Sequence, residues 1–242
     1  MEQPQWLGVI RHGQSTGNVI AQDAETAGSE AIDIPERDAD VPLSETGREQ
    51  AEAVGAWLRG RKPDERPALV VVSPYLRTRQ TAELALAGTG IPAVVDERLR
   101  DRELGVLDLL TGRGVQARLP GEHARRVRLG KFYYRPPGGE SWADVLLRLR
   151  ALLREVRADH PGGRVLLVGH EATVLLVRYL AESLSEAELM AVAHATAVAN
   201  CSISTWRRDG DRLLPDLFNS VAHLHSEGAR PTRQEDVNAE PV

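Results

Sequence analysis

The sequence contains few cysteine, lysine or aromatic residues. Cys201 is the single cysteine of 242 residues, which excludes an internal disulfide framework. Lys62 and Lys131 are the only lysines, and no apolar run approaches the ~20 residues that a membrane span needs. The sequence does not open with a basic stretch followed by an apolar core, so we expect no signal peptide. These absences predict a cytoplasmic protein that does not act in a membrane.

The overall charge argues against polyanionic partners. The formal net charge is −5 at neutral pH, so we do not expect nucleic acid or an anionic membrane surface as a partner. A small anionic ligand would need a local cluster of cations instead. The length suits one or two domains, and nothing in the sequence fixes the oligomeric state, so a homodimer is left open.

Short apolar runs alternate with amphipathic stretches along most of the chain. The pattern predicts strands at 5–10, 69–73, 93–95 and 164–170, and a hairpin of 202–206 with 213–217 around Asp209-Gly210. It predicts helices at 43–60, 76–87, 141–159, 171–182 and 185–193, with Thr46 and Glu49 as a capping box for the first. Such alternation predicts an α/β fold, a three-layer α/β/α sandwich with a mostly parallel central sheet.

The remaining segments give the expected domain plan. Residues 106–139 are rich in glycine and proline, and we interpret them as an inserted, partly helical lid. From residue 226 the chain is polar and aperiodic, which predicts a disordered tail over 226–242. We therefore expect one domain over residues 1–225.

Three of the predicted strands end at chemically informative residues. The first delivers Arg11 and His12, the second leads through Ser73 to Arg77, and the fourth ends at His170. The carboxyl ends of parallel strands share one edge of a sheet, where ligands gather, so these side chains are expected to meet. Two guanidiniums with an imidazole suit a phosphate group, since arginine binds phosphate oxygens bidentately.

This set of residues permits phosphoryl transfer. A neutral histidine can attack phosphorus in line, while fixed positive charge stabilises the transition state and depresses the pKa of the nucleophile. The leaving alkoxide needs a proton, for which Asp101 and Glu103 are candidate acids. Asn18 and the backbone of Ser15-Thr16-Gly17, at an expected helix start, could donate further hydrogen bonds to phosphate.

Several of these motifs together resemble the histidine phosphatase superfamily, the phosphoglycerate mutase-like proteins. Arg11-His12-Gly13 with Asn18 is similar to its signature. Later segments match in the family's order: Leu43-Ser44-Glu45-Thr46-Gly47 with Gln50-Ala51, Ser73-Pro74-Tyr75-Leu76-Arg77-Thr78-Arg79-Gln80-Thr81-Ala82, Gly139-Glu140-Ser141, Val168-Gly169-His170 and Asn200. The resemblance spans roughly residues 7–225 and rests on independent motifs.

The resemblance implies roles for particular residues. His12 would be the phosphorylated nucleophile, and Arg11, Arg77 and His170 would complete the phosphate pocket, with no metal and no organic cofactor. Asp101 stands four residues before Gly105, where the family usually has a glutamate as proton donor, and Glu103 is the longer alternative.

Substrate contacts are implied less directly. Gln14 replaces the glutamate of the family's Arg-His-Gly-Glu variant, and Asn18, Thr16 and Gly17 would bind substrate beside it. The segment 130–141 resembles a subgroup of broad-specificity phosphatases, in which Arg135 would lie in the lid above the phosphate.

Structural interpretations compete with several of these assignments. Asp101 and Glu103 alternate with Arg98, Arg100 and Arg102, which a solvated ladder of ion pairs would also explain. His223 and His225 have no acidic or cysteine partner at metal-ligand spacing, so a packing or surface role is expected. The buried setting expected for Cys201 favours a core residue over a nucleophile, and the cluster Arg125-Arg126-Val127-Arg128 is either a solvated helix face or an extension of the substrate pocket.

The sequence thus predicts a metal-independent phosphomonoesterase that acts on a small phosphorylated metabolite through phosphohistidine at His12. One alternative keeps this chemistry but transfers the phosphoryl group to a sugar-acid acceptor, as in a mutase. Another is a non-catalytic module that binds a phosphorylated ligand. The physiological substrate depends on the segments 19–42 and 106–139, which have little periodicity.

Overall fold

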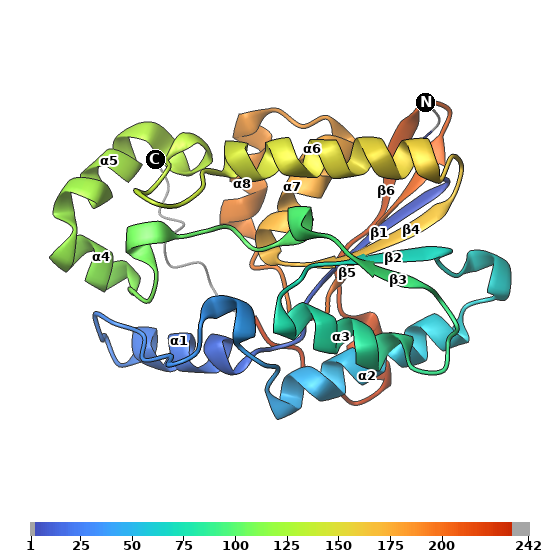
Figure 1. Cartoon of the computed structure of the whole chain (residues 1–242), viewed down its shortest axis with the longest axis horizontal. Coiled ribbons are helices and arrows are strands. Elements are labelled where there is room, and N and C mark those ends of the chain that lie inside the picture. The colour runs from blue at the N-terminus through green and yellow to red at the C-terminus, as the bar shows by residue number, and fades with distance from the viewer. Residues whose placement is uncertain (1–2, 234–242) are drawn as a thin grey trace.

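A single sheet forms the centre of the computed structural model, which describes residues 3–233 (Figure 1). Its six strands are β1 (Trp6–Arg11), β2 (Leu69–Val72), β3 (Ala93–Val95), β4 (Arg164–Gly169), β5 (Ile203–Asp209) and β6 (Arg212–Ser220). The strand order is β3-β2-β4-β1-β5-β6. The first four in this order are parallel, whereas β5 and β6 are antiparallel and form the predicted hairpin. The prediction of a mostly parallel sheet is confirmed.

Five of the described helices match those that the sequence predicts: α2 (Glu45–Gly60), α3 (Leu76–Leu86), α6 (Trp142–Asp159), α7 (Glu171–Glu182) and α8 (Glu186–Ala195). The others are α1 (Thr16–Thr26), α4 (Gly112–Arg118), α5 (Pro120–Tyr133) and α9 (Ala222–Ser226). Short 3-10 helices lie between them: η1 (Asp38–Asp40), η2 (Pro63–Glu65), η3 (Glu97–Leu99) and η4 (Gly105–Leu107). None of the described helices is both long and apolar enough to cross a lipid bilayer.

Helix caps show how local sequence sets these boundaries. Ser141 caps α6 in a capping box with Asp144, which satisfies backbone donors at the helix start. The capping box predicted for α2 is wrong: Ser44, not Thr46, is the N-cap residue and accepts a hydrogen bond from the backbone of Gly47. Both residues have short hydroxyl side chains. Ser44 is the cap because its backbone is extended, whereas Thr46 lies within the helix.

The sheet is covered on both faces, which gives the predicted three layers. Alternate side chains of β1 point to opposite faces: Leu7 and Val9 pack into one core with α6, α7 and α8, whereas Trp6 and Ile10 pack into another with α2 and α3. In Figure 1 these two groups of helices lie above and below the sheet. Complete burial of β1 explains its continuous apolar sequence.

The two irregular segments of the chain lie together. Residues 106–139 contain α4 and α5, and Figure 1 shows them on the same side of the molecule as α1. Ile32 donates a backbone hydrogen bond to Leu109 at 2.9 Å, and Thr111 donates from its hydroxyl to the carbonyl of Ser29 at 2.6 Å. The loop after α1 and the segment before α4 are therefore joined into one wall.

The chain after α9 is packed rather than free. Ala229 is buried, and the side chain of Gln50 donates to the carbonyl of Arg230 at 2.8 Å and to Thr232 at 2.9 Å. The expectation of a disordered tail therefore needs correction for residues 226–233, because buried polar contacts rather than periodicity hold this segment. Residues 234–242 of that expectation lie outside the described residues.

Candidate active site

The ends of β1, β2 and β4 bring the predicted residues together. His12 follows β1 and His170 follows β4, and their ring centroids lie 5.3 Å apart. Ser73, at the end of β2, has its hydroxyl 2.8 Å from Nε2 of His170. The sequence prediction that these strand ends converge is confirmed, and the parallel pairing of β4 with both β1 and β2 is its cause.

The orientation of His12 defines which nitrogen can react. Its Nδ1 lies 2.7 Å from the carbonyl oxygen of Gly13. A carbonyl only accepts hydrogen bonds, so Nδ1 carries the proton and the lone pair of the neutral ring is on Nε2. Nε2 therefore has the electronic state that a nucleophile requires.

The surroundings of His12 keep it neutral. Burial lowers its pKa well below the ordinary value, and the positive charge of Arg77, the neighbouring His170 and Arg11 lower it further. The hydrogen bond to Gly13 opposes this shift. The predicted effect of the cations is present, although burial contributes more.

Two buried guanidiniums flank the imidazoles. Arg11 donates to the carbonyl of Val198 and lies 3.9 Å from a carboxylate oxygen of Glu171, while its Nε has no hydrogen-bond partner among the described residues. Arg77, at the start of α3, is held by the carboxylates of Asp38 and Asp101, at 2.9 and 3.1 Å. Both guanidiniums of the site thus have carboxylates beside them, and an anionic ligand would share the guanidiniums with these acids.

Asp101 joins two of the predicted residues. Its Oδ2 lies 3.1 Å from Nη2 of Arg77 and 3.1 Å from Nδ1 of His170. The second approach is short but poorly aligned for a hydrogen bond, so we treat it as an electrostatic contact. Burial alone would raise the pKa of Asp101, but His170 and Arg77 together hold it well below the ordinary value.

Glu103 lies farther from the imidazoles than Asp101 does. It is exposed, and one of its carboxylate oxygens accepts a hydrogen bond of 3.3 Å from the hydroxyl of Tyr75. Two arginines of the ladder considered as an alternative pair with other acids: Arg98 with Asp96 and Glu155, and Arg100 with Glu140. Asp101 pairs instead with Arg77.

The predicted substrate-binding residues near His12 make structural contacts. Asn18 is in the capping box of α1, and its side-chain oxygen accepts from the backbone of Ser15 at 3.0 Å. The backbone of Thr16 donates to the carbonyl of Pro42 at 3.0 Å, and Gly17 is buried in the first turn of α1. Gln14 accepts at its side-chain oxygen from Ser44 at 2.8 Å. These residues hold the loop after His12, and a role in substrate binding remains a proposal.

Arg135 is directed elsewhere. Its Nε donates to the carbonyl of Gly139 at 3.0 Å and lies 3.6 Å from Asp144 at the start of α6. These contacts are not with the residues around His12. The exposed side chains of Arg125 and Arg128 are on α5, so both interpretations of that cluster stay open.

The remaining candidates have packing roles. His223 is buried beside Trp57, with ring centroids 6.5 Å apart, and burial lowers its pKa to about 4. Cys201 is buried, and burial raises the pKa of its thiol. The described part of the chain contains no group of three or more histidine, cysteine, aspartate or glutamate side chains suited to a metal ion.

Sequence reasoning missed two supports of the site. Thr81 accepts a hydrogen bond from the backbone of Gly13 at 3.0 Å and donates to the carbonyl of Arg77 one turn earlier at 2.7 Å, so it joins the loop after His12 to α3. Asp38, in the aperiodic loop 19–42, contacts Arg77 through both its carboxylate and its backbone carbonyl. Thr81 lies in a motif and could have been noticed, whereas Asp38 has no sequence signal.

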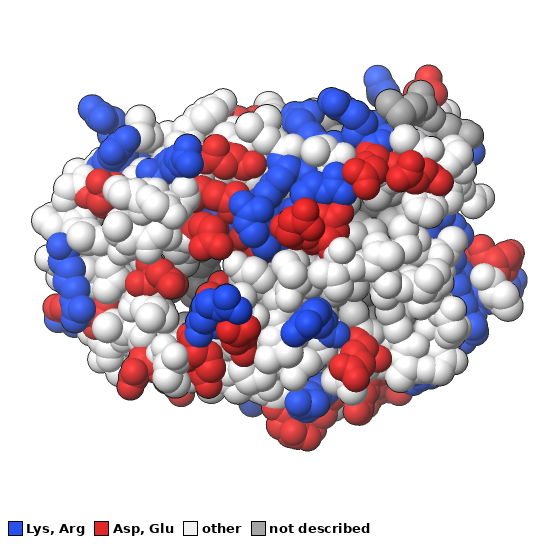
Figure 2. All heavy atoms as spheres, viewed as in Figure 1, with Lys and Arg blue, Asp and Glu red and all other residues white. Residues whose placement is uncertain are grey.

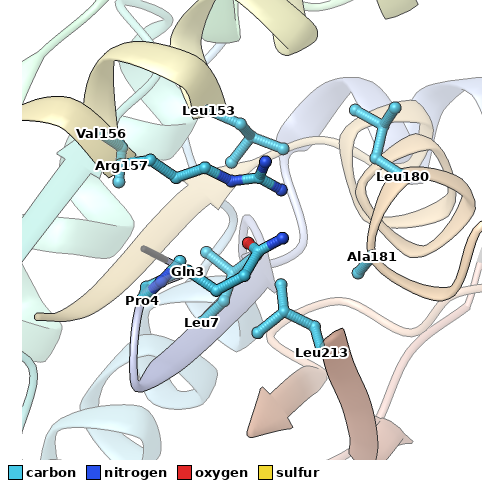
Figure 3. Close-up of a pocket in the computed structure, with 9 residues that line it drawn as sticks. All are labelled: Gln3, Pro4, Leu7, Leu153, Val156, Arg157, Leu180, Ala181 and Leu213. Atoms are coloured by element: carbon cyan, nitrogen blue, oxygen red, sulfur yellow. The ribbon is translucent and has the colours of Figure 1, made fainter. Parts of the chain in front are cut away.

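An apolar hollow lies away from these residues. Figure 3 shows it beside Leu7 of β1, between Leu153 of α6 and Leu180 of α7. Among the described residues that line it, Arg157 is the one ionisable side chain, and burial lowers its pKa.

With this geometry established, comparison with known proteins identifies the family. The model of the histidine phosphatase superfamily (branch 1) matches residues 7–220. The chain belongs to this superfamily. It is therefore a histidine phosphatase by family, a hydrolase of phosphoric monoesters.

Two relatives of this histidine phosphatase illustrate its similarities. It is 34% identical over 240 residues to glucosyl-3-phosphoglycerate phosphatase of Mycobacterium tuberculosis, covering 91% of this chain and 97% of the relative. It is 30% identical over 164 residues to a probable phosphoglycerate mutase, GpmB, of Photorhabdus laumondii, covering 67% of each chain.

A solved structure is also similar. The mycobacterial glucosyl-3-phosphoglycerate phosphatase in complex with VO3 superposes with a TM-score of 0.71 and 30% identity, covering 89% of this chain and 99% of the other. The predicted fold class and family are thereby confirmed.

Proposed function

We propose that this protein hydrolyses small phosphomonoesters through a phosphohistidine at His12, without a metal. The observation that carries the proposal is the hydrogen bond from Nδ1 of His12 to the carbonyl of Gly13 at 2.7 Å. It places the lone pair on Nε2, and the lowered pKa of the ring keeps that lone pair available at neutral pH.

In the first step, Nε2 of His12 attacks phosphorus in line. A P–N bond forms while the bond between phosphorus and the ester oxygen breaks. Arg11 and Arg77, buried beside the ring, stabilise the negative charge on the phosphoryl oxygens. His170 adds a further polar contact, oriented by Ser73.

The leaving oxygen takes a proton from Asp101. His170 and Arg77 hold the pKa of Asp101 below its ordinary value despite burial, so its carboxylate is ionised. A phosphate dianion bound at Arg77 competes for the same guanidinium and raises the pKa of Asp101, which allows it to carry the proton. In the second step Asp101 takes a proton from water, whose oxygen attacks phosphorus and breaks the P–N bond.

Replacing His12 with alanine tests the proposal. We expect turnover of para-nitrophenyl phosphate by His12→Ala to fall to the background rate, because the nucleophile is lost. Wild-type protein denatured at alkaline pH, where the P–N bond of phosphohistidine survives, should carry one phosphoryl group on the peptide that contains His12, and the variant none. Retained turnover in a folded His12→Ala protein would overturn the proposal.

The similarity to a probable phosphoglycerate mutase makes phosphoryl transfer to a second alcohol the other candidate. Incubation with 3-phosphoglycerate, with and without a bisphosphate primer, distinguishes the two reactions. Hydrolysis releases inorganic phosphate, whereas a mutase forms 2-phosphoglycerate.

A further inference from the structure

The side of the site where the alcohol half of an ester would lie is bordered by carboxylates. We propose that Asp38, Glu103 and Asp108, named here the acidic rim, select phosphomonoesters whose alcohol half carries no negative charge. This inference rests on the proposed function, and it names a substrate class for that site.

The contacts of Arg77 place the first member of the rim. Nη1 of Arg77 donates to the Asp38 carbonyl at 2.6 Å and to its carboxylate at 2.9 Å. Asp38 is thus held by two hydrogen bonds at the guanidinium that would bind phosphate. An ester bound at Arg77 therefore has its alcohol half close to a carboxylate that is half exposed to solvent.

Tyr75 shows that the other acids face the same place. Its ring lies 5.2 Å from the ring of His170 and 4.9 Å from the guanidinium carbon of Arg77. Its hydroxyl donates to Glu103 at 3.3 Å. Asp38 and Asp101 both pair with the Arg77 guanidinium that lies over this ring, so these carboxylates and Glu103 lie around Tyr75. The pKa of Tyr75 agrees with this, since burial raises it and the charges of Glu103, Asp38 and Asp101 raise it further.

Asp108 completes the rim from the neighbouring segment. Leu109, the residue after Asp108, accepts a backbone hydrogen bond of 2.9 Å from Ile32, which lies in the same loop as Asp38. The raised pKa of Asp108, caused by partial burial and then by the carboxylate of Asp38, agrees with this placement. The two carboxylates therefore belong to one wall of the site.

The cations of the site are already in contact with acids. Arg77 is shared by Asp38 and Asp101, and Arg11 lies 3.9 Å from Glu171. In the proposed function a phosphate group binds at both guanidiniums and shares them with these acids. A second anionic group on the alcohol half would instead meet the carboxylates of the rim, and like charges brought together weaken binding.

A matched pair of esters measures this selection. Glycerol 3-phosphate and 3-phosphoglycerate have similar size. They differ chiefly at one end of the alcohol half, where the first has a hydroxymethyl group and the second a carboxylate. We expect wild-type kcat/KM to favour glycerol 3-phosphate by at least about tenfold, and the preference to shrink in high salt because screening weakens the repulsion. Phosphoethanolamine, with a cationic alcohol half, should be used at least as well as glycerol 3-phosphate.

Removing one charge of the acidic rim should lower the ratio of kcat/KM for glycerol 3-phosphate to kcat/KM for 3-phosphoglycerate. In Asp38→Asn and Asp108→Asn we expect the preference to fall at least about threefold, mainly through a lower KM for 3-phosphoglycerate. Asp64→Asn is the matched control, because Asp64 is exposed on η2, which precedes β2 and so lies at the opposite end of that strand. The ratio of the kcat/KM values for the two esters does not depend on how much of each variant is folded.

The outcomes separate the two proposals. Two results would overturn the inference about the acidic rim and leave the proposed function standing. One is equal or better use of 3-phosphoglycerate by the wild type. The other is a kcat/KM ratio of the two esters that is the same in the rim variants as in Asp64→Asn. Absence of wild-type turnover with every ester, para-nitrophenyl phosphate included, would overturn the proposed function, and this inference with it.

Discussion

At the scale of single residues, the site is a set of competing contacts around two imidazoles and two guanidiniums. Arg77 is the centre of this competition, because Asp38 and Asp101 both pair with its guanidinium. A bound phosphate must share this guanidinium with two carboxylates. The charge state of Asp101 therefore depends on what else Arg77 contacts.

Leaving-group chemistry distinguishes the two candidate acids. We expect Asp101→Asn to slow hydrolysis of glycerol 3-phosphate by about 100-fold or more, since general acid catalysis contributes on that order. Hydrolysis of para-nitrophenyl phosphate should change much less, because nitrophenolate leaves without a proton. Glu103→Gln, which removes a charge farther from His170, should leave the ratio of the two rates nearly unchanged.

Kinetic parameters for both esters provide the measurement. Equal losses on both substrates in Asp101→Asn would indicate that Asp101 only positions Arg77 and His170. A selective loss on the alkyl ester in Glu103→Gln would instead assign the proton donor to Glu103.

At the scale of elements, the first turn of α2 packs directly on the loop after His12. A Cβ atom on Gly47 would lie 2.0 Å from the carbonyl oxygen of Gln14. A Cβ atom on Gly13 would lie 2.4 Å from the carbonyl oxygen of Gly47. This contact between two backbones leaves no space for a side chain on either side.

Gly47→Ala should therefore separate α2 from the loop. We expect an unfolding free energy lower by about 1–3 kcal/mol, as for other overpacked sites, and a lower kcat because His12 moves with the loop. Gly60→Ala, at the last residue of the same helix, is the control, since a Cβ atom there meets nothing within 4 Å. Urea unfolding and para-nitrophenyl phosphate kinetics of both variants test this, and equal stability of the two would contradict it.

The elements that bury a face could be predicted from sequence, and those held by single polar contacts could not. β1, β4 and α6 have apolar patterns set by the layers that cover them. Their positions, and the convergence of His12 with His170, could therefore be predicted from the sequence. The loop that carries Asp38 has no buried face and is placed by its hydrogen bonds to Arg77. Such contacts between distant residues leave no periodic signal in the chain.

At the scale of the whole molecule, buried histidines link stability to pH. The pKa of His223 is about 4 in the folded protein, against 6.5 in an unfolded chain. Below pH 6.5 the unfolded state binds a proton that the folded state excludes, so stability present at neutral pH is lost as the pH falls toward 4. His12 and His170 act in the same direction, because burial lowers the pKa of both.

His223→Phe isolates one of these contributions while keeping a ring beside Trp57. We expect its unfolding free energy to fall less steeply than that of the wild type between pH 6.5 and 4, by up to about 1.4 kcal/mol per pH unit. Phosphatase activity at neutral pH should be unchanged, because His223 lies outside the site. Urea unfolding across this pH range, with exposed His160→Gln as the control, measures the difference, and parallel curves for wild type and His223→Phe would contradict it.

The segment after α9 connects distant parts of the chain at the site. Asn200 donates from its side chain to the carbonyl of His12 at 3.1 Å, and Thr232 donates to the side-chain oxygen of Asn200 at 3.0 Å. Gln50, which holds Thr232, also accepts a hydrogen bond from the backbone of Gln14. A polypeptide growing on the ribosome therefore cannot complete the support of His12 until Thr232 has left the exit tunnel, although His12 itself is among the first residues to emerge.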